Sequence, residues 1–156
     1  MSVKKFHVKQ LANIQINRTE KRFRISDIQK TKQWLHAVAK KENHKIESIS
    51  YTFVSDEKLL EMNKSVLKHD YYTDIITFSL SDNSDIEGDI YISYERIAEN
   101  ANVFHVKRSQ EIRRIMVHGL LHLCGFNDKS KSEKLAMTSK ENVYLNLYDK
   151  MFHVKQ

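Results

Sequence analysis

Length, composition and charge set the first limits on what this chain can be. Its 156 residues, 40% of them hydrophobic, suit one domain with one core and exclude a fully disordered chain. The single cysteine excludes an intramolecular disulfide and a cysteine-rich zinc site, and it suits a reducing compartment. The net charge of +6 favours a polyanionic partner, although many basic proteins bind no nucleic acid.

The sequence has no segment typical of a secretion signal, a membrane span or a linker. Lys4 and Lys5 are not followed by an apolar stretch, and no apolar run approaches the roughly 20 residues that span a bilayer. Proline is absent and there are only three glycines, so no Pro-rich or Gly/Ser linker divides the chain. We therefore expect one cytoplasmic domain over residues 1–156 that contacts no membrane.

Strands are predicted mainly in the first two thirds of the chain. They are expected where apolar and polar residues alternate or where β-branched and aromatic residues gather, at 13–17, 46–54, 74–80 and 89–93. The acidic stretch 81–87 is expected to be a loop. Ser26 or Asp27 can cap a helix that ends near residue 41, and Ser55 or Asp56 can cap the next helix.

The last third of the chain is predicted to be helical, at 94–103, 109–124 and 132–151, with Ser109 as the cap of the middle helix. Early strands followed by helices indicate an α+β fold, a single mixed sheet packed with helices. We expect the helix 109–124 near its centre.

The residues best suited to chemistry lie at the end of that helix. His118 and His122 are four residues apart and share one helix face, and Gly125 can end the helix so that Asp128 returns as a third ligand. Three protein ligands leave a position for water, which is typical of a catalytic metal site. We expect His118, His122 and Asp128 to hold one metal ion, most simply zinc, for hydrolysis. Alternatively, both histidines are core residues paired with backbone groups.

Two residues near the histidines, Cys124 and Gly119, limit which ligands and which class of hydrolase we expect. Cys124 lies about 200° around the helix from His122 and is expected in the core rather than as a ligand. Metzincin proteases share the spacing of ligands and glycine but place a glutamate directly after the first histidine as the general base. Here that residue is Gly119, so a zinc metalloprotease-like hydrolase is the second choice among enzymes.

Three ordered motifs give the chain a resemblance to a known family. The first is His118-Gly-Leu-Leu-His-Leu-Cys-Gly-Phe-Asn-Asp128, preceded by Thr73-Asp-Ile-Ile-Thr-Phe78 and Gly88-Asp-Ile-Tyr-Ile-Ser93. In this order and spacing they resemble the YbeY family of metal-dependent single-strand endoribonucleases. The resemblance implies a role in ribosomal RNA maturation and ribosome quality control, with ribosomal RNA and the ribosome or small-subunit proteins as partners.

The chain departs from the family pattern at two positions. Asp128 stands where the family has a histidine, and Leu67 stands where the family has an arginine that could stabilise phosphate charge. Lys68, Arg113 and Arg114 are the candidates to replace that arginine as catalytic residues. If Asp128 is not a ligand, His69 and His105 are the next histidines to test.

Two further features stay open. Tyr71 and Tyr72 could stack on bases of single-stranded RNA or pack in the core. The peptide Phe-His-Val-Lys recurs at Phe6, Phe104 and Phe152 with irregular spacing, which excludes a solenoid period, and its histidines are not expected to bind metal. A non-enzymatic rival is a ribosome-associated RNA-binding factor in which the metal only fixes the loop after Gly125.

Overall fold

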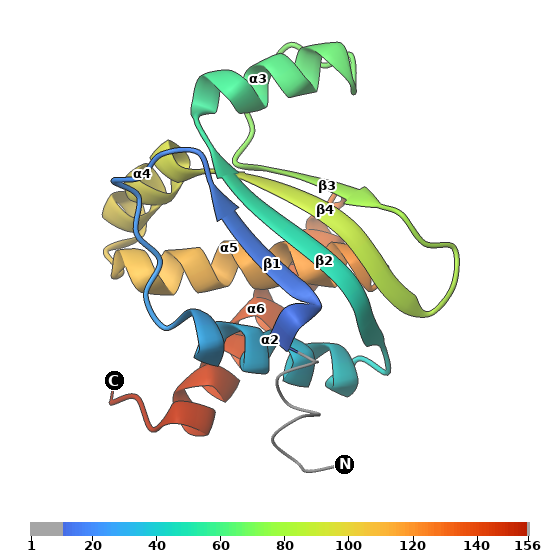
Figure 1. Cartoon of the computed structure of the whole chain (residues 1–156), viewed down its shortest axis with the longest axis vertical. Coiled ribbons are helices and arrows are strands. Elements are labelled where there is room, and N and C mark those ends of the chain that lie inside the picture. Colours follow the sequence, from blue (N-terminus) through green and yellow to red (C-terminus); the bar gives the residue numbers. More distant parts are fainter. Residues whose placement is uncertain (1–10, 156) are drawn as a thin grey trace.

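The structure is a computed structural model and describes residues 11–155. It contains four strands and five long helices in the order β1, α2, β2, α3, β3, β4, α4, α5, α6 (Figure 1). The strands are β1 (Ile14–Arg18), β2 (Lys45–Val54), β3 (Ile75–Ser79) and β4 (Asp85–Ser93). The helices are α2 (Ile28–Lys41), α3 (Asp56–Ser65), α4 (Tyr94–Phe104), α5 (Arg108–Leu123) and α6 (Lys131–Phe152).

The four strands form one mixed sheet in the order β1-β2-β4-β3. The first three strands in this order are parallel, and β3 pairs antiparallel with β4 at the edge. Parallel neighbours need crossover connections, which α2 and the α3–β3 segment supply. The predicted α+β fold with a single mixed sheet is confirmed.

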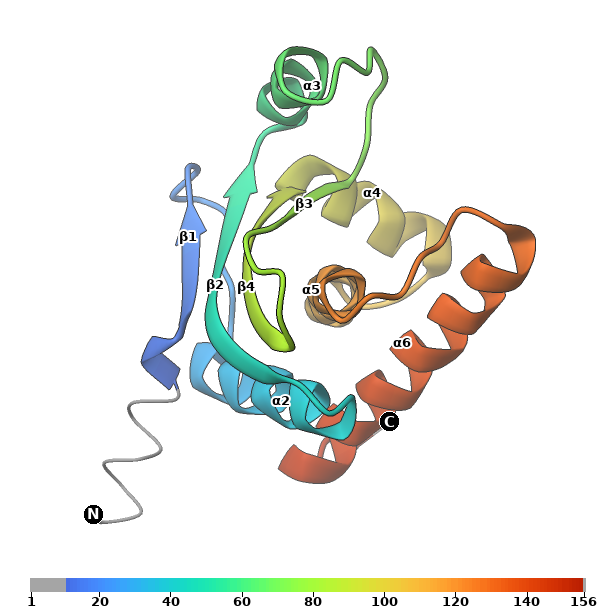
Figure 2. The ribbon, with the colours of Figure 1, turned by 90° about the vertical axis from the view of Figure 1, so that its right-hand side faces the viewer.

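Helices cover one face of the sheet, and α5 lies between the sheet and α6 (Figure 2). Alternate residues of the central strands point into this layer, where Ile49, Tyr51, Ile90 and Ile92 are fully buried or nearly so. The buried Trp34 of α2 joins the layer to α6. A central position for α5, as predicted, follows from this arrangement.

The other face of the sheet is largely polar apart from one small apolar cluster beneath α3. Val54, Leu59 and Ile76 form its buried part, with Phe78 and Tyr91 packed against them. Ser55 accepts a hydrogen bond from the Lys58 backbone and so caps α3, which agrees with one of the two predicted caps.

Gly119 allows α5 to lie close to the sheet. A Cβ atom at this position would meet the Cδ1 atoms of Ile75 and Ile90, each at 3.0 Å. A glutamate here would have to enter the apolar layer between α5 and the sheet, where its carboxylate would be desolvated without a partner. The position after the first histidine therefore serves packing and is closed to the general base that a metzincin protease requires.

The predicted starts of β4 and α5 were wrong, and strand pairing explains the first. β4 begins at Asp85, inside the predicted loop, because Asp85 and Ile86 pair with the start of β2 despite their acidic surroundings. α5 begins at Arg108 with Lys107 at the N-cap position and without a side-chain cap, so Ser109 is not the cap. Asp27 does precede α2, but its side chain makes no capping hydrogen bond.

The last helix begins with a capping box that the sequence analysis did not use. Ser130 accepts a hydrogen bond from the Glu133 backbone, and the Glu133 side chain accepts one from the Ser130 backbone. α6 therefore starts at Lys131, one residue before the predicted start. No helix in the described part of the chain is both long and apolar enough to cross a membrane.

Two copies of the recurring peptide end helices in the same way. α4 ends at Phe104 and α6 at Phe152, and the histidine after each is left-handed, with φ 54° at His105 and 53° at His153. The following valine then donates a backbone hydrogen bond to a carbonyl five residues earlier, as in a Schellman motif. The repeat is thus a helix stop that uses histidine in place of glycine. The first copy, at residues 6–9, lies outside the described residues.

Candidate metal centre

The end of α5 and the turn after it bring the three predicted ligands together. His118 and His122 lie one turn apart on α5. Gly125 has a φ of +102°, a conformation that residues with a Cβ rarely adopt, and the Phe126 backbone N–H bonds back to the Leu121 carbonyl. This reversal directs Asp128 back over the end of the helix. The predicted helix stop at Gly125 is confirmed.

The three side chains present their ligand atoms to one point. The Nε2 atoms of His118 and His122 are 3.0 Å apart, and Asp128 Oδ2 lies 3.3 Å from the first and 3.4 Å from the second. All three residues are partly buried, and their ligand atoms lie within 4.8 Å of one another. His118, His122 and Asp128 could therefore hold a metal ion, as the sequence predicts.

Hydrogen bonds at the other ring nitrogens orient both histidines. His118 Nδ1 lies 2.7 Å from Glu141 Oε2, and His122 Nδ1 lies 2.8 Å from the Phe126 carbonyl oxygen. Both partners are acceptors, so each Nδ1 carries the proton and each Nε2 keeps its lone pair for a ligand bond. The same turn that returns Asp128 thus also fixes the ring of His122.

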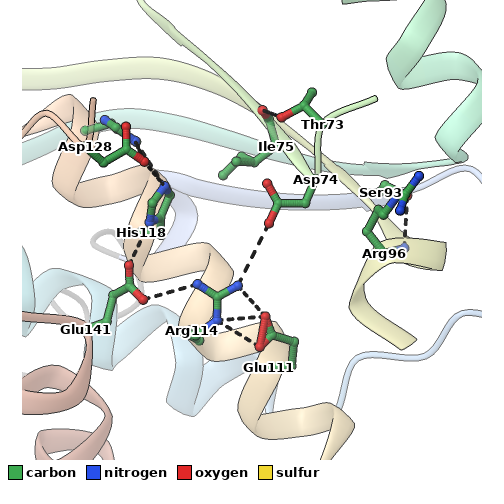
Figure 3. Close-up of polar contacts among 11 residues, drawn as sticks. Thr73, Asp74, Ile75, Ser93, Arg96, Glu111, Arg114, His118, Asp128 and Glu141 are labelled. Atoms are coloured by element: carbon green, nitrogen blue, oxygen red, sulfur yellow. Dashed lines mark hydrogen bonds and ion pairs between the residues drawn. The ribbon is translucent and has the colours of Figure 1, made fainter. Parts of the chain in front are cut away.

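A network of charged groups extends from His118 beneath the cluster (Figure 3). Glu141 of α6 accepts a bond from Arg114 Nη1 at 3.2 Å, and Arg114 Nε donates to both oxygens of Glu111 at 2.7 and 2.8 Å. Asp74, next to β3, lies 3.9 Å from Arg114 Nη2. These contacts link the candidate ligand His118 to α6, to the start of α5 and to the residue before the edge strand β3.

Arg114 pairs with two buried carboxylates. Glu111 and Glu141 are only 1% and 5% exposed, and an unpaired charge at either position would be costly. Burial alone would lower the pKa of Arg114, but the hydrogen bonds and negative charges of Glu111 and Glu141 outweigh it and raise the pKa above its ordinary value. The guanidinium is therefore permanently charged, and its charge is committed to these carboxylates.

The other candidate residues lie outside the cluster. Arg113 points to a different side of α5, where its guanidinium carbon lies 4.2 Å from the centre of the Tyr148 ring. Lys68 follows α3 in an exposed segment and has a φ of +57°. Cys124 packs against the core, and burial raises the pKa of its thiol to about 12, so it is not the reactive thiolate that metal binding requires.

The remaining histidine and tyrosine candidates lie on two exposed segments. His105 ends α4, and His69 stacks on Tyr71 between α3 and β3, with ring centroids 5.2 Å apart. Tyr71 and Tyr72 are each 57% exposed, which excludes core packing for both. Tyr72 lies against Arg96, whose guanidinium carbon is 5.3 Å from the ring centre.

Sequence reasoning missed Glu141, although the sequence carries a signal for it. Met137, Glu141, Tyr144 and Tyr148 follow a helical spacing, and all four are buried. A carboxylate on an otherwise apolar helix stripe needs a buried partner, which here is the His118–Arg114 pair. The partner is on another helix, so spacing within α6 could not identify it.

Comparison with known proteins assigns the chain to a family. The family model described as endoribonuclease YbeY matches residues 13–149, which include all three predicted ligands. The chain belongs to the YbeY family. Among curated proteins named endoribonuclease YbeY, it is 50% identical to one from Cytophaga hutchinsonii over 115 residues, which are 73% of this chain and 80% of that protein. It is 41% identical to another from Christiangramia forsetii over 138 residues, 88% of this chain and 94% of that protein.

A solved structure has a similar fold. The solution structure of TM1509 from Thermotoga maritima is similar, with a TM-score of 0.64 and 25% identity, and the match covers 90% of this chain and 91% of that one. Membership of the YbeY family does not favour the metalloprotease alternative, and the packing of Gly119 against the sheet gives the physical reason.

Proposed function

We propose that this chain is a metal-dependent endoribonuclease that cleaves single-stranded RNA and acts in ribosomal RNA maturation and ribosome quality control. The observation that carries the proposal is the convergence of His118, His122 and Asp128 in a chain of the YbeY family. The relatives are named endoribonucleases, and the net charge of +6 suits a polyanionic substrate.

We propose zinc as the metal, held by these three residues. Two imidazole nitrogens and one carboxylate oxygen are ligands that zinc favours. Ligands about 2.1 Å from a tetrahedral zinc lie about 3.4 Å apart, close to the separations of 3.0, 3.3 and 3.4 Å among the three atoms. When bound, zinc would polarise a phosphate oxygen and lower the pKa of water.

The protein residues prepare this site in three ways. Glu141 and the Phe126 carbonyl hold the Nε2 lone pairs of the two histidines toward one point. Arg114 holds Glu141 in place through a hydrogen bond, and we propose it as a positioning residue rather than a phosphate contact, because its charge is paired with carboxylates. Lys68, next to the residue at the family's arginine position, remains the candidate phosphate contact from the α3–β3 segment.

The remaining proposals concern location and domain extent. Ribosomal RNA, with ribosomal or small-subunit proteins, is the proposed partner, and such a role requires the cytoplasm, where a lone thiol such as Cys124 stays reduced. We propose that residues 1–156 act as one metallo-hydrolase domain, because the family model spans residues 13–149.

The experiment is a cleavage assay on matched single-stranded and double-stranded RNA. We expect cleavage of the single strand by the metal-loaded chain, loss of cleavage after chelation, recovery with zinc, and no cleavage by the His118→Ala variant. Circular dichroism of the chelated chain then distinguishes a catalytic metal from the rival hypothesis of a structural metal, because it shows whether the protein stays folded. If chelation unfolds the protein, and the loaded protein binds RNA without cutting it, the metal is structural and the enzyme proposal is wrong.

A further inference from the structure

Two adjoining cavities form a groove that begins beside the metal cluster and continues along α5 and α6. The first has a volume of about 570 Å³, and Arg114 and Glu141, the residues that lead to His118, form part of its wall. The second has a volume of about 560 Å³. The two share their lining at Val106, Gln110, Asn142 and Leu145, so they adjoin one another. Figure 2 shows α4 and α6 on either side of α5 along this course.

The recurring peptide builds the far end of the groove. The copy that ends α4 supplies His105, Val106 and Lys107, and the copy that ends α6 supplies Val154 and Lys155. Because both copies stop their helices with the same left-handed histidine, each sends its lysine out of the helix and toward the same cavity. The two copies of the repeat therefore place two lysines, Lys107 and Lys155, at the same cavity.

Positive charge dominates this end. Lys107, Arg113 and Lys155 line the cavity against a single carboxylate, Asp149. The Arg113 guanidinium carbon lies 4.2 Å from the centre of the Tyr148 ring. Lysine and arginine side chains that line a cavity can contact phosphate groups.

The stretch between the two ends suits bases. Phe104 is 56% exposed at the edge of the first cavity, and Val106 and Leu145 give it further apolar surface. Gln110 and Asn142 place exposed amides beside them, with donors and acceptors for base edges. An exposed aromatic ring followed by amides and then cations is the arrangement that binds single-stranded nucleic acid.

We infer that this groove binds the single-stranded RNA segment on one side of the cleavage point, with bases near Phe104 and phosphates at Lys107, Arg113 and Lys155. The inference rests on the proposed function for the identity of the metal end. His118 and Lys107 are separated by eleven residues of helix rise, about 16 Å. A strand with phosphates spaced by about 3.4 Å or more reaches from one to the other within a few nucleotides. Arg113, predicted as a catalytic candidate, thereby becomes a substrate contact away from the metal.

The test measures RNA binding without cleavage. Fluorescein-labelled hexauridylate is titrated with chelated, metal-free protein over a range of salt concentrations, for the native chain and for Lys107→Gln combined with Lys155→Gln. We expect the double variant to bind roughly tenfold more weakly at low salt, and its plot of log affinity against log salt to be shallower by about 1.4, the loss of two single-strand phosphate contacts. Phe104→Ala should weaken binding without changing that slope.

A second variant removes the same charge elsewhere. Lys40 and Lys41 at the end of α2 line neither cavity, and changing both to glutamine should leave affinity and slope within about a third of the native values. The proposal is wrong if the two double variants lose equal affinity for hexauridylate or if neither loses any. It is also wrong if the native chain does not bind hexauridylate. Binding is scored apart from cleavage, so a chain that binds through the groove but does not cut would contradict the proposed function alone.

Discussion

The face of α5 toward the sheet and its face toward α6 carry different kinds of residue. Toward the sheet, Gly119 lets the helix approach Ile75 and Ile90, and the Met116 carbonyl accepts a hydrogen bond from Tyr51. Toward α6 and the turn after Gly125 it presents Arg114, His118 and His122, and each of these pairs with a side chain or carbonyl supplied by another segment.

This difference separates what stabilises the fold from what makes the site. The sheet-side face requires apolar volume, so changes there should lower stability and leave the metal cluster intact. The site-side face requires particular groups, so changes there should alter metal binding with a smaller effect on the fold. The predictions below test that separation, from the largest expected effect to the smallest.

Met116→Ala should cost the most stability. Met116 is fully buried, and removing its side chain leaves a cavity between α5 and the sheet. We expect the free energy of unfolding to fall by about 2–5 kcal/mol, measured by urea denaturation, with an unchanged metal content per folded chain. If folded Met116→Ala protein contains less metal than the native chain, the two faces are not independent.

Asp128→Ala should have the largest effect on metal binding among the single site variants outside the histidines. It removes one of three ligands, and we expect zinc affinity to fall by more than about 100-fold in competition with a chelating dye, beyond the loss typical of a supporting residue. Asp128→His restores a ligand and the family pattern, so it should retain most of the affinity. If the alanine variant binds zinc as the native chain does, Asp128 is only a turn residue.

Glu141→Gln should weaken zinc binding by about 10-fold to 100-fold, because the amide cannot replace the charged acceptor that orients His118. The matched control is Glu42→Gln, which changes a carboxylate that also pairs with α6 but bonds to Lys140 and Tyr144 rather than to a histidine of the cluster. Equal zinc affinities in the two variants would refute a positioning role for Glu141.

Glu42→Gln should have the smallest effect on the free energy of unfolding, and the size of this effect should depend on pH. Glu42 accepts hydrogen bonds from Tyr144 and, at 3.0 Å, from Lys140. Burial alone would raise the pKa of Glu42, but these two partners outweigh it and lower the pKa below its ordinary value of 4.5.

A carboxylate with a lowered folded-state pKa stabilises the protein above about pH 4.5 and loses this contribution as pH falls through the folded pKa. Replacing Glu42 should therefore cost about 1 kcal/mol at neutral pH. The variant should also lose less stability than the native chain on acidification below pH 4.5, as followed by thermal melts. An equal acid loss in both chains would contradict this.

The sequence predicted what depends on neighbouring residues. The helix spacing of His118 and His122 and the glycine turn were enough to place the cluster, and alternation was enough to find the strands of the sheet. The sequence did not predict where strand pairing in the folded sheet and the packing of helices set the ends of elements. β4 extends into an acidic stretch because Asp85 and Ile86 pair with the start of β2, and Lys107 stands at the N-cap position of α5 without a side-chain cap.

Glu141, which orients His118, could not be predicted because it comes from a distant segment. It lies 23 residues beyond His118 on another helix. The recurring peptide was noticed but not explained, since its role depends on the left-handed backbone that each copy adopts after a helix. Spacing along one helix predicts ligands, whereas the groups that orient them require the fold.

Metal content is the most direct test of the central claim that α5 and its turn form a metal centre. The chain should be purified without added metal, and elemental analysis should compare it with the combined His118→Ala and His122→Ala variant, with Cys124→Ala as a control. We predict about one zinc per native or Cys124→Ala chain and almost none in the double variant, with all three folded by circular dichroism. Full metal content in the double variant would contradict the account.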